Sequence, residues 1–115
     1  MAYVEGFVVP VPTGKRAEYL AMAQRVAAAF KEYGALSVVE CWGHEVPEGK
    51  VTSFPLSVKL EPGETVVFSW IRWPSREVRD AGHAKFVADL RMEKEEMPFD
   101  GKRMIWGGFD VILDV

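Results

Sequence analysis

The chain is 115 residues long, with 49% hydrophobic residues, 27% charged residues and a formal net charge of -3. This length fits a single domain over residues 1–115, and the acidic balance with scattered Lys and Arg argues against a nucleic-acid partner. The apolar runs fall well short of the roughly 20 residues that span a bilayer, so we expect no membrane partner. The single cysteine, Cys41, excludes an internal disulfide and favours a reducing, cytoplasmic location.

The first half of the chain predicts a strand, a helix and a second strand. Residues Tyr3–Val11 are mostly β-branched and aromatic, which indicates a strand. Apolar residues at helical spacing follow, so we expect a helix that Thr13 caps and that runs to about Tyr33. Gly34 supplies a residue able to adopt positive φ at the end of this helix. The second predicted strand is Leu36–Glu45.

The second half predicts a strand, a helix and a final strand. Thr65–Trp73 is the third predicted strand, and Ser75 is the expected N-cap of the second helix. A turn at Met97–Gly101 leads to the last strand, Met104–Leu113. The apolar stripe expected to bury the second helix is Val78, Ala81, Gly82, Phe86 and Leu90.

The resulting order, β-α-β-β-α-β, is that of the α+β ferredoxin-like fold, an antiparallel sheet with two helices on one face. In this fold the first strand lies between the third and the fourth. The sequence therefore predicts which strands are neighbours, but not which side chains share a face.

The predicted strands are apolar on both faces, although two helices cover only one face of a sheet. If residues of similar size share a face, the small ones pack against the helices and the bulky ones face away. Exposing five bulky side chains would forgo roughly 1.5–3 kcal/mol each, so we expect a homodimer that packs sheet against sheet. The small set is Gly6, Cys41, Gly43, Val67 and Gly107, and the bulky set is Phe7, Trp42, Phe68, Trp70 and Trp106.

The connection from about Val46 to Gly63, called the arm below, is far longer than a hairpin needs. Apolar and polar residues alternate along it from Ser53 to Leu60, as in an extended segment that buries one side. The arm could fold back on its own sheet or cross to the partner subunit, and we favour the crossing.

Four stretches of the chain carry a family pattern: GFVVPVP at 6–12, TSFP at 52–55, ETVVFSWI at 64–71 and MPFDGKRMIWGGF at 97–109. They resemble the YbaA-like family, a bacterial family of uncharacterised function, and the last stretch is the most specific. The resemblance implies a dimeric α/β-barrel of ferredoxin-like subunits. It implies no activity, and it transfers no catalytic residues.

The candidate catalytic residues are charges that follow the bulky pattern of their strands: Glu5, Arg72 and Asp110. Buried charges need partners, and the strand order would place Glu5 near the other two. One interpretation is a network that lines a cavity, in which two adjacent carboxylates supply a base. The alternative is a structural Arg72–Glu5 pair that fixes the dimer register. Aromatic walls for a flat organic ligand would come from Trp42, Phe68, Trp70 and Trp106.

The remaining polar residues form no recognisable motif. Two histidines with scattered carboxylates do not have metal-ligand spacing, so we expect no metal and no cofactor. We interpret His44 and His83 as residues on the rim of the fold, and Cys41 as a small core residue.

The last predicted turn and strand contain two further signals. Lys102 and Arg103 follow an Asp-Gly turn, where they form either an anion site or an ordinary solvated turn. Gly107 and Gly108 weaken the strand, which indicates a bulge or a close approach of another group to the backbone.

Two functions remain open from the sequence. The first is a cofactor-independent enzyme, or a binder of a small organic molecule, with a cavity on the sheet face. It requires a pocket that touches Trp70, Trp106 and at least one of the three candidate charges. The second is a non-catalytic binding or stress-related dimeric module with a solid core.

Overall fold

The computed structural model describes residues 2–115, in which four strands form one antiparallel sheet in the order β2-β3-β1-β4. The predicted succession of strands and long helices is confirmed, and β1 lies between β3 and β4. The elements are β1 (Tyr3–Pro12), η1 (Thr13–Lys15), α1 (Arg16–Glu32), β2 (Ser37–Trp42), α2 (Phe54–Ser57), β3 (Glu64–Trp73), α3 (Arg76–Ala88), α4 (Leu90–Glu93) and β4 (Ile105–Asp110).

The predicted helix signals are partly confirmed. Gly34 has φ of 111°, and the Ser75 hydroxyl accepts a hydrogen bond from the Val78 amide, as expected of a C-terminal glycine and an N-cap. Thr13 does not cap α1, because a short 3-10 turn precedes the helix and the Thr13 hydroxyl bonds to that of Thr65 instead.

The second long helix ends earlier than its apolar stripe predicts. α3 stops at Ala88, and the extended backbone of Asp89 redirects the chain into α4. Leu90 is therefore exposed, and Met92 is the residue of this segment that enters the core. No helix within residues 2–115 is long and apolar enough to cross a membrane.

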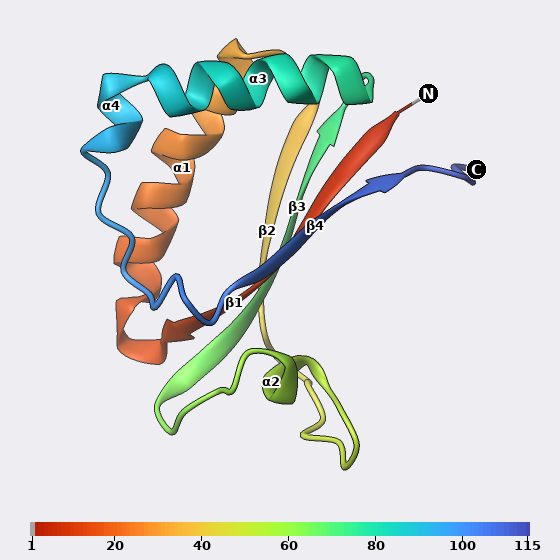
Figure 1. The fold of residues 1–115 in the computed structure, drawn as a ribbon. Helices are drawn as coiled ribbons and strands as arrows, with labels where there is room; N and C mark the ends of the chain where they lie inside the picture. Colours follow the sequence, from red (N-terminus) through yellow and green to blue (C-terminus); the bar gives the residue numbers. More distant parts are fainter. Residues whose placement is uncertain (1) are drawn as a thin grey trace.

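The two long helices, α1 and α3, lie on one side of the sheet, and α2 lies on the other (Figure 1). The helix side is built from alternate residues of each strand, since side chains in a strand point to opposite faces. Two clusters of buried side chains fill this layer, one around Phe30 and Trp73 and one around Val9, Met22 and Val67.

The predicted assignment of the two sheet faces is wrong. Phe7, Trp42 and Trp106 from the bulky set lie on the helix side, whereas Gly6 and Gly107 from the small set pair with each other on the far side. Cross-strand pairing sets large residues opposite small ones, as where Phe7 pairs with Ser69, so no row contains residues of one size.

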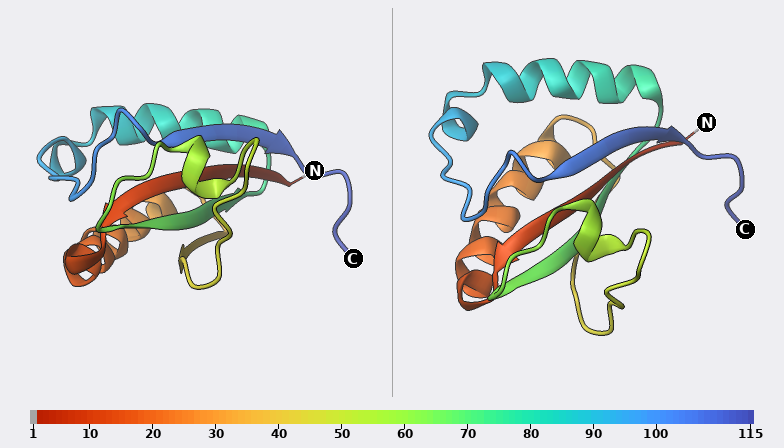
Figure 2. Two further views of the ribbon diagram at one scale, coloured as in Figure 1. Left: turned by 90° about the horizontal axis from the view of Figure 1, so that it is seen from below. Right: turned by 60° about the horizontal axis from the view of Figure 1, so that its bottom comes forward.

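The arm folds onto its own chain, contrary to the predicted crossing to a partner. Its Val58 is 1% exposed, and its Phe54 ring lies 5.7 Å from the ring of Phe68 on the far face. The right-hand view of Figure 2 shows α2 and the arm across the strands from α1 and α3. The alternating segment is also not extended, because Ser53 caps a helical turn that Pro55 favours.

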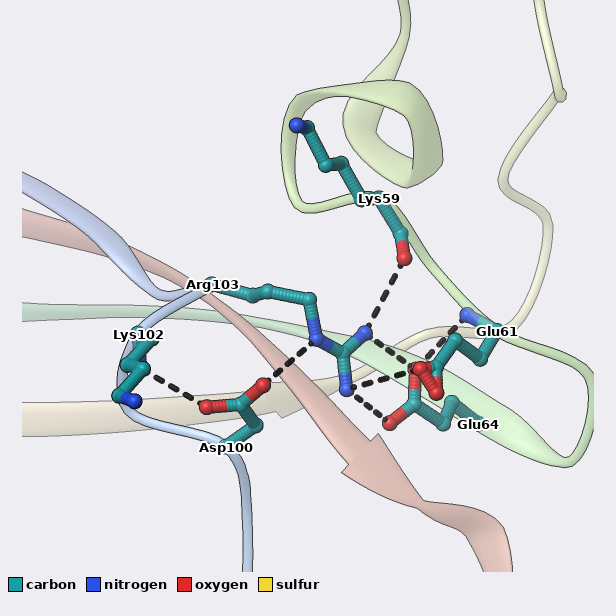
Figure 3. Close-up of polar contacts among 6 residues, drawn as sticks. All are labelled: Lys59, Glu61, Glu64, Asp100, Lys102 and Arg103. Carbon is teal, nitrogen blue, oxygen red and sulfur yellow. Dashed lines mark hydrogen bonds and ion pairs between the residues drawn. The ribbon is translucent and has the colours of Figure 1, made fainter.

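Arg103 clamps the arm to the loop that precedes β4 (Figure 3). Its two terminal nitrogens donate to the two carboxylate oxygens of Glu64, each at 2.7 Å, and its Nε donates to Asp100 at 3.0 Å. Nη1 also donates to the Lys59 carbonyl. Because carboxylates occupy this guanidinium, Arg103 is not an anion site, whereas the Lys102 amide donates to Asp100 Oδ1 and Lys102 is exposed, as the ordinary solvated turn predicts.

Candidate functional site

A cavity of about 370 Å³ lies between the helices and the sheet. Side chains from β1, β3, α1, α3 and the loop before β4 surround it, and most are apolar. Such a volume and lining are typical of a small-molecule site rather than a packing defect. The main apolar lining comprises Val9, Met22, Val26, Phe30, Ile71 and Phe86.

Glu5 is the one fully buried carboxylate among residues 2–115, and it lines this cavity. Its Oε1 accepts a hydrogen bond from Trp73 Nε1 at 2.8 Å. Its Oε2 lies 2.7 Å from His83 Nε2 and 3.6 Å from Arg79 Nη1. A carboxylate so deeply buried is stabilised by these two cationic or polar neighbours.

The local sequence explains why α3 supplies these partners. Ser75 starts α3 two residues after Trp73, and Arg79 and His83 are four residues apart, so both lie on the helix face that covers β1. Gly82 lies between them, where a Cβ atom would stand 2.5 Å from the Trp73 ring. The glycine therefore lets α3 approach the sheet closely enough for both side chains to reach Glu5.

The second oxygen of Glu5 lacks a directed hydrogen bond within residues 2–115, although His83 and Arg79 are near. Arg79 Nη1 is too far for a hydrogen bond, whereas His83 Nε2 is within hydrogen-bond distance. A buried acceptor left without a donor costs roughly 1–3 kcal/mol. Because Oε2 is buried, the partly exposed imidazole of His83, which also lines the cavity, is the group through which a ligand could reach this carboxylate.

Tyr3 positions Arg79 at this end of the cavity. The Arg79 guanidinium lies over the Tyr3 ring, 4.8 Å from its centroid, and Nη2 donates to the Tyr3 hydroxyl at 3.0 Å. The Tyr3 hydroxyl occupies the space that a Cβ atom on Gly108 would need. This contact confirms the predicted close approach at the glycine pair, and its source is Tyr3 rather than a bulge.

A second polar group lies at the other side of the cavity, where Glu40 accepts a hydrogen bond from the Tyr19 hydroxyl at 2.7 Å. Partial burial raises the pKa of the Glu40 carboxyl, while hydrogen bonds from Tyr19 and Ser69 oppose that rise. Burial and the adjacent carboxylate raise the pKa of Tyr19, so the phenol remains a donor at neutral pH.

The three predicted catalytic residues do not come together. Arg72 lies on the far face, where it pairs with Asp114 at 2.7 Å, because its partner in the sheet is Val4 rather than Glu5. Asp110 is opposite Tyr3 at the exposed end of β4. The predicted Arg72–Glu5 pair is therefore wrong, and Glu5 alone of the three lines the cavity.

The four predicted aromatic residues are split between the two faces. Trp106 lines the cavity with its ring centroid 6.3 Å from that of His83, and Trp70 also borders the cavity. Phe68 lies on the far face, 5.7 Å from the Trp70 ring centroid. Trp42 lies beneath Arg16 at the start of α1, outside the cavity lining. The pocket required for a small-molecule function is thus present, on the helix side.

Sequence reasoning misplaced two further residues. Cys41 is exposed on the edge strand β2, not in the core, and His83 contacts a buried carboxylate instead of standing alone on the rim. Arg79 and His83, spaced one helical turn apart, could have indicated a shared partner. Within residues 2–115, no three His, Cys, Asp or Glu side chains gather as a metal site would require.

The comparisons of sequence identify the family. The chain is 58% identical over 116 residues to proteins titled "Uncharacterized protein YbaA" from Escherichia coli strain K12 and from Shigella flexneri, with 99% of each chain covered. A solved structure of the de novo designed protein Foldit4 covers 96% of this chain and 99% of its own, at 12% identity and a TM-score of 0.48. The family model described as "Protein of unknown function (DUF1428)" matches residues 2–101, and the chain belongs to that family.

Proposed function

We propose that the protein binds a small, mostly apolar organic molecule in the cavity between its helices and its sheet. The observation that carries this proposal is the cavity itself, about 370 Å³ with a mostly apolar lining and a few convergent polar groups. Ligand pockets occupy roughly 300–1,000 Å³ and have this composition.

The direct test is to identify what the cavity holds. Protein purified under native conditions is denatured, and the released small molecules are identified by mass spectrometry. We expect a planar, largely apolar compound in stoichiometric amount. Equilibrium dialysis with para-nitroanisole, an uncharged aromatic probe, measures binding independently of any natural ligand.

A matched pair of α1 variants locates the binding. Ala27→Phe places a large ring in the cavity lining, whereas Ala28→Phe places it on the exposed side of the same helix. We expect Ala27→Phe to reduce probe binding at least about tenfold, a loss of about 1.4 kcal/mol, and Ala28→Phe to leave it unchanged. Equal binding by both variants would contradict the proposal.

We also propose that two copies associate through the far face of the sheet, as ferredoxin-like subunits of a dimeric α/β-barrel. The strand order, with two helices on one side, supports this fold class. The far face keeps Phe68, Ile105 and Phe109 at 39%, 44% and 59% exposure. Monomers rarely leave such a contiguous apolar patch in water, and a two-fold pairing of the same patch covers it.

Light scattering tests this association. The wild-type protein is expected at twice the mass of one chain, Phe109→Lys at the mass of one chain, and Leu90→Lys at twice that mass. Leu90 is also an exposed apolar residue, but it lies in α4 on the helix side. A monomeric wild-type protein would remove the dimer and leave the cavity proposal intact.

A further inference from the structure

The polar end of the cavity has the parts of a proton-accepting site. Glu5 is 0% exposed and lines the cavity, and its Oε2 is buried behind His83 with no directed hydrogen bond from residues 2–115. The His83 imidazole lines the same end of the cavity, and it favours a ligand that carries a hydroxyl group there. The apolar remainder of the lining limits the ligand to one such polar end.

His83 links this carboxylate to the outside of the cavity. Its Nε2 is 2.7 Å from Oε2, while 38% of its side chain is exposed. The neighbouring residue Trp106, which also lines the cavity, is 57% exposed. A proton that reaches Glu5 therefore has an imidazole within hydrogen-bond distance and a path from that imidazole to solvent.

Arg79 completes the electrostatics of the site. Its Nη1 lies 3.6 Å from Oε2, and its side chain is 13% exposed. A fixed positive charge at this distance stabilises negative charge at the polar end of the cavity, both on Glu5 and on an anionic ligand oxygen. The polar groups at this end are thus the Glu5 carboxylate and the His83 imidazole in the lining, with the Arg79 guanidinium behind them, while Glu40 lies at the other side of the cavity.

We propose that Glu5 and His83 act together as a general base that removes the proton from a phenol or enol hydroxyl of the bound molecule. The ligand's O–H bond breaks as its proton passes to the pair, and the electron pair stays on the ligand oxygen as a phenolate or enolate. The proton ends on the His83 imidazole, which then carries two N–H groups beside the Glu5 carboxylate. No oxidant, reductant or second substrate takes part in this step.

This inference rests on the proposed binding function, and one probe pair separates the two. Para-nitrophenol carries the ionisable hydroxyl and absorbs visible light only when ionised, whereas para-nitroanisole has a methyl group in place of the proton. At a pH where free para-nitrophenol is mostly neutral, we expect the bound phenol to be ionised. The acid dissociation constant of the bound phenol should rise about tenfold or more, which lowers its pKa by about one unit.

Three variants test the roles of the two residues. Glu5→Gln and His83→Gln should each lose the extra ionisation, measured at para-nitrophenol concentrations that saturate each variant. Glu93→Gln removes the same charge as Glu5→Gln from the exposed side of α4 and should behave as wild type. Since Glu5→Gln could fail to fold, circular dichroism accompanies each measurement, and the partly exposed His83 provides the second variant.

The outcomes distinguish the two proposals. If para-nitroanisole binds but bound para-nitrophenol stays neutral in the wild-type protein, the proposed general base is wrong. The proposal that the cavity binds a small molecule is then unaffected. Full ionisation of bound para-nitrophenol in both Glu5→Gln and His83→Gln would likewise contradict the role of these residues as the general base. If neither probe binds, the cavity proposal fails, and this inference fails with it.

Discussion

Glu5 of β1 and His83 of α3 meet at 2.7 Å across the layer between sheet and helix, although 78 positions separate them in the chain. The contact depends on Gly82, which holds α3 against Trp73, and on Arg79, which balances the same carboxylate. Substitution of any of these residues should therefore change the free energy of unfolding in addition to any effect on function.

Glu5→Ala should destabilise the fold strongly. The substitution leaves Trp73 Nε1 without its acceptor and removes the buried carboxylate beside Arg79, whose Nε also pairs with the exposed Asp80 at 2.9 Å. Removing one partner of a buried pair costs about 3–5 kcal/mol, and urea unfolding followed by tryptophan fluorescence measures the loss. Asp110→Asn, at an exposed position on the same sheet face, should change the free energy of unfolding by less than about 0.5 kcal/mol.

Gly82→Ala should also destabilise the protein, although alanine is the better helix former. Its Cβ would lie 2.5 Å from Trp73 Cη2, so either α3 or the tryptophan ring must move. Overpacking of this kind costs about 1–3 kcal/mol, more than the roughly 1 kcal/mol that helix propensity returns. Gly14→Ala is the control, because its Cβ would meet nothing within 4 Å. A Gly82→Ala protein as stable as wild type would show that α3 is not held by this contact.

The Arg103 clamp predicts a pH-dependent stability difference. Arg103 lowers the pKa of both the Glu64 and the Asp100 carboxyls in the folded protein. Carboxyls with lowered pKa values stabilise the fold at pH values above their ordinary pKa values of 4.5 and 3.8. This stabilisation is lost as the pH falls through the lowered pKa values of the folded protein. The midpoint of urea unfolding should therefore be lower in Arg103→Met than in wild type at about pH 7, with the gap narrowing toward pH 3. A gap that does not change with pH would assign the role of Arg103 to packing alone.

Tyr19→Phe should weaken the fold by about 1 kcal/mol, the usual net value of a hydrogen bond. Tyr19 lowers the pKa of Glu40, whose folded value is raised overall by burial. A carboxyl whose pKa is raised by folding stabilises the fold at pH values below its pKa in the unfolded chain. This stabilisation is lost as the pH rises through its pKa in the folded protein. The substitution raises this pKa further, so its cost should be larger at about pH 7 than at about pH 4. In a Glu40→Gln background that pH dependence should vanish.

The sequence predicts the elements well because their signals are local. Strand composition, the glycine at the end of α1 and the Ser75 cap each depend on a few neighbouring residues, and all three appear in the structure. The order of strands also follows, because the succession of elements restricts how the chain can cross the sheet.

The faces of the sheet and the site could not be predicted in the same way. Which face Glu5 occupies depends on strand register, and a shift of one residue would exchange both faces. The partnership with His83 depends in addition on the rotation of α3 above β1. Residue size was a poor guide because Phe7 lies opposite Ser69, and Glu5 opposite Gly108.

Aromatic rings lie on both faces of the β1–β4 pairing: Tyr3 of β1 occupies the space above Gly108, and the ring of Phe109, in β4 itself, lies over Gly6 and Gly107. Sliding the strand by two positions would bring Trp106 or Asp110 to the place of Gly108, where Tyr3 leaves no room for a side chain. Slipped or domain-swapped pairings of this edge strand are thereby disfavoured. The register of β4 is therefore fixed, and with it the position of Trp106 beside His83.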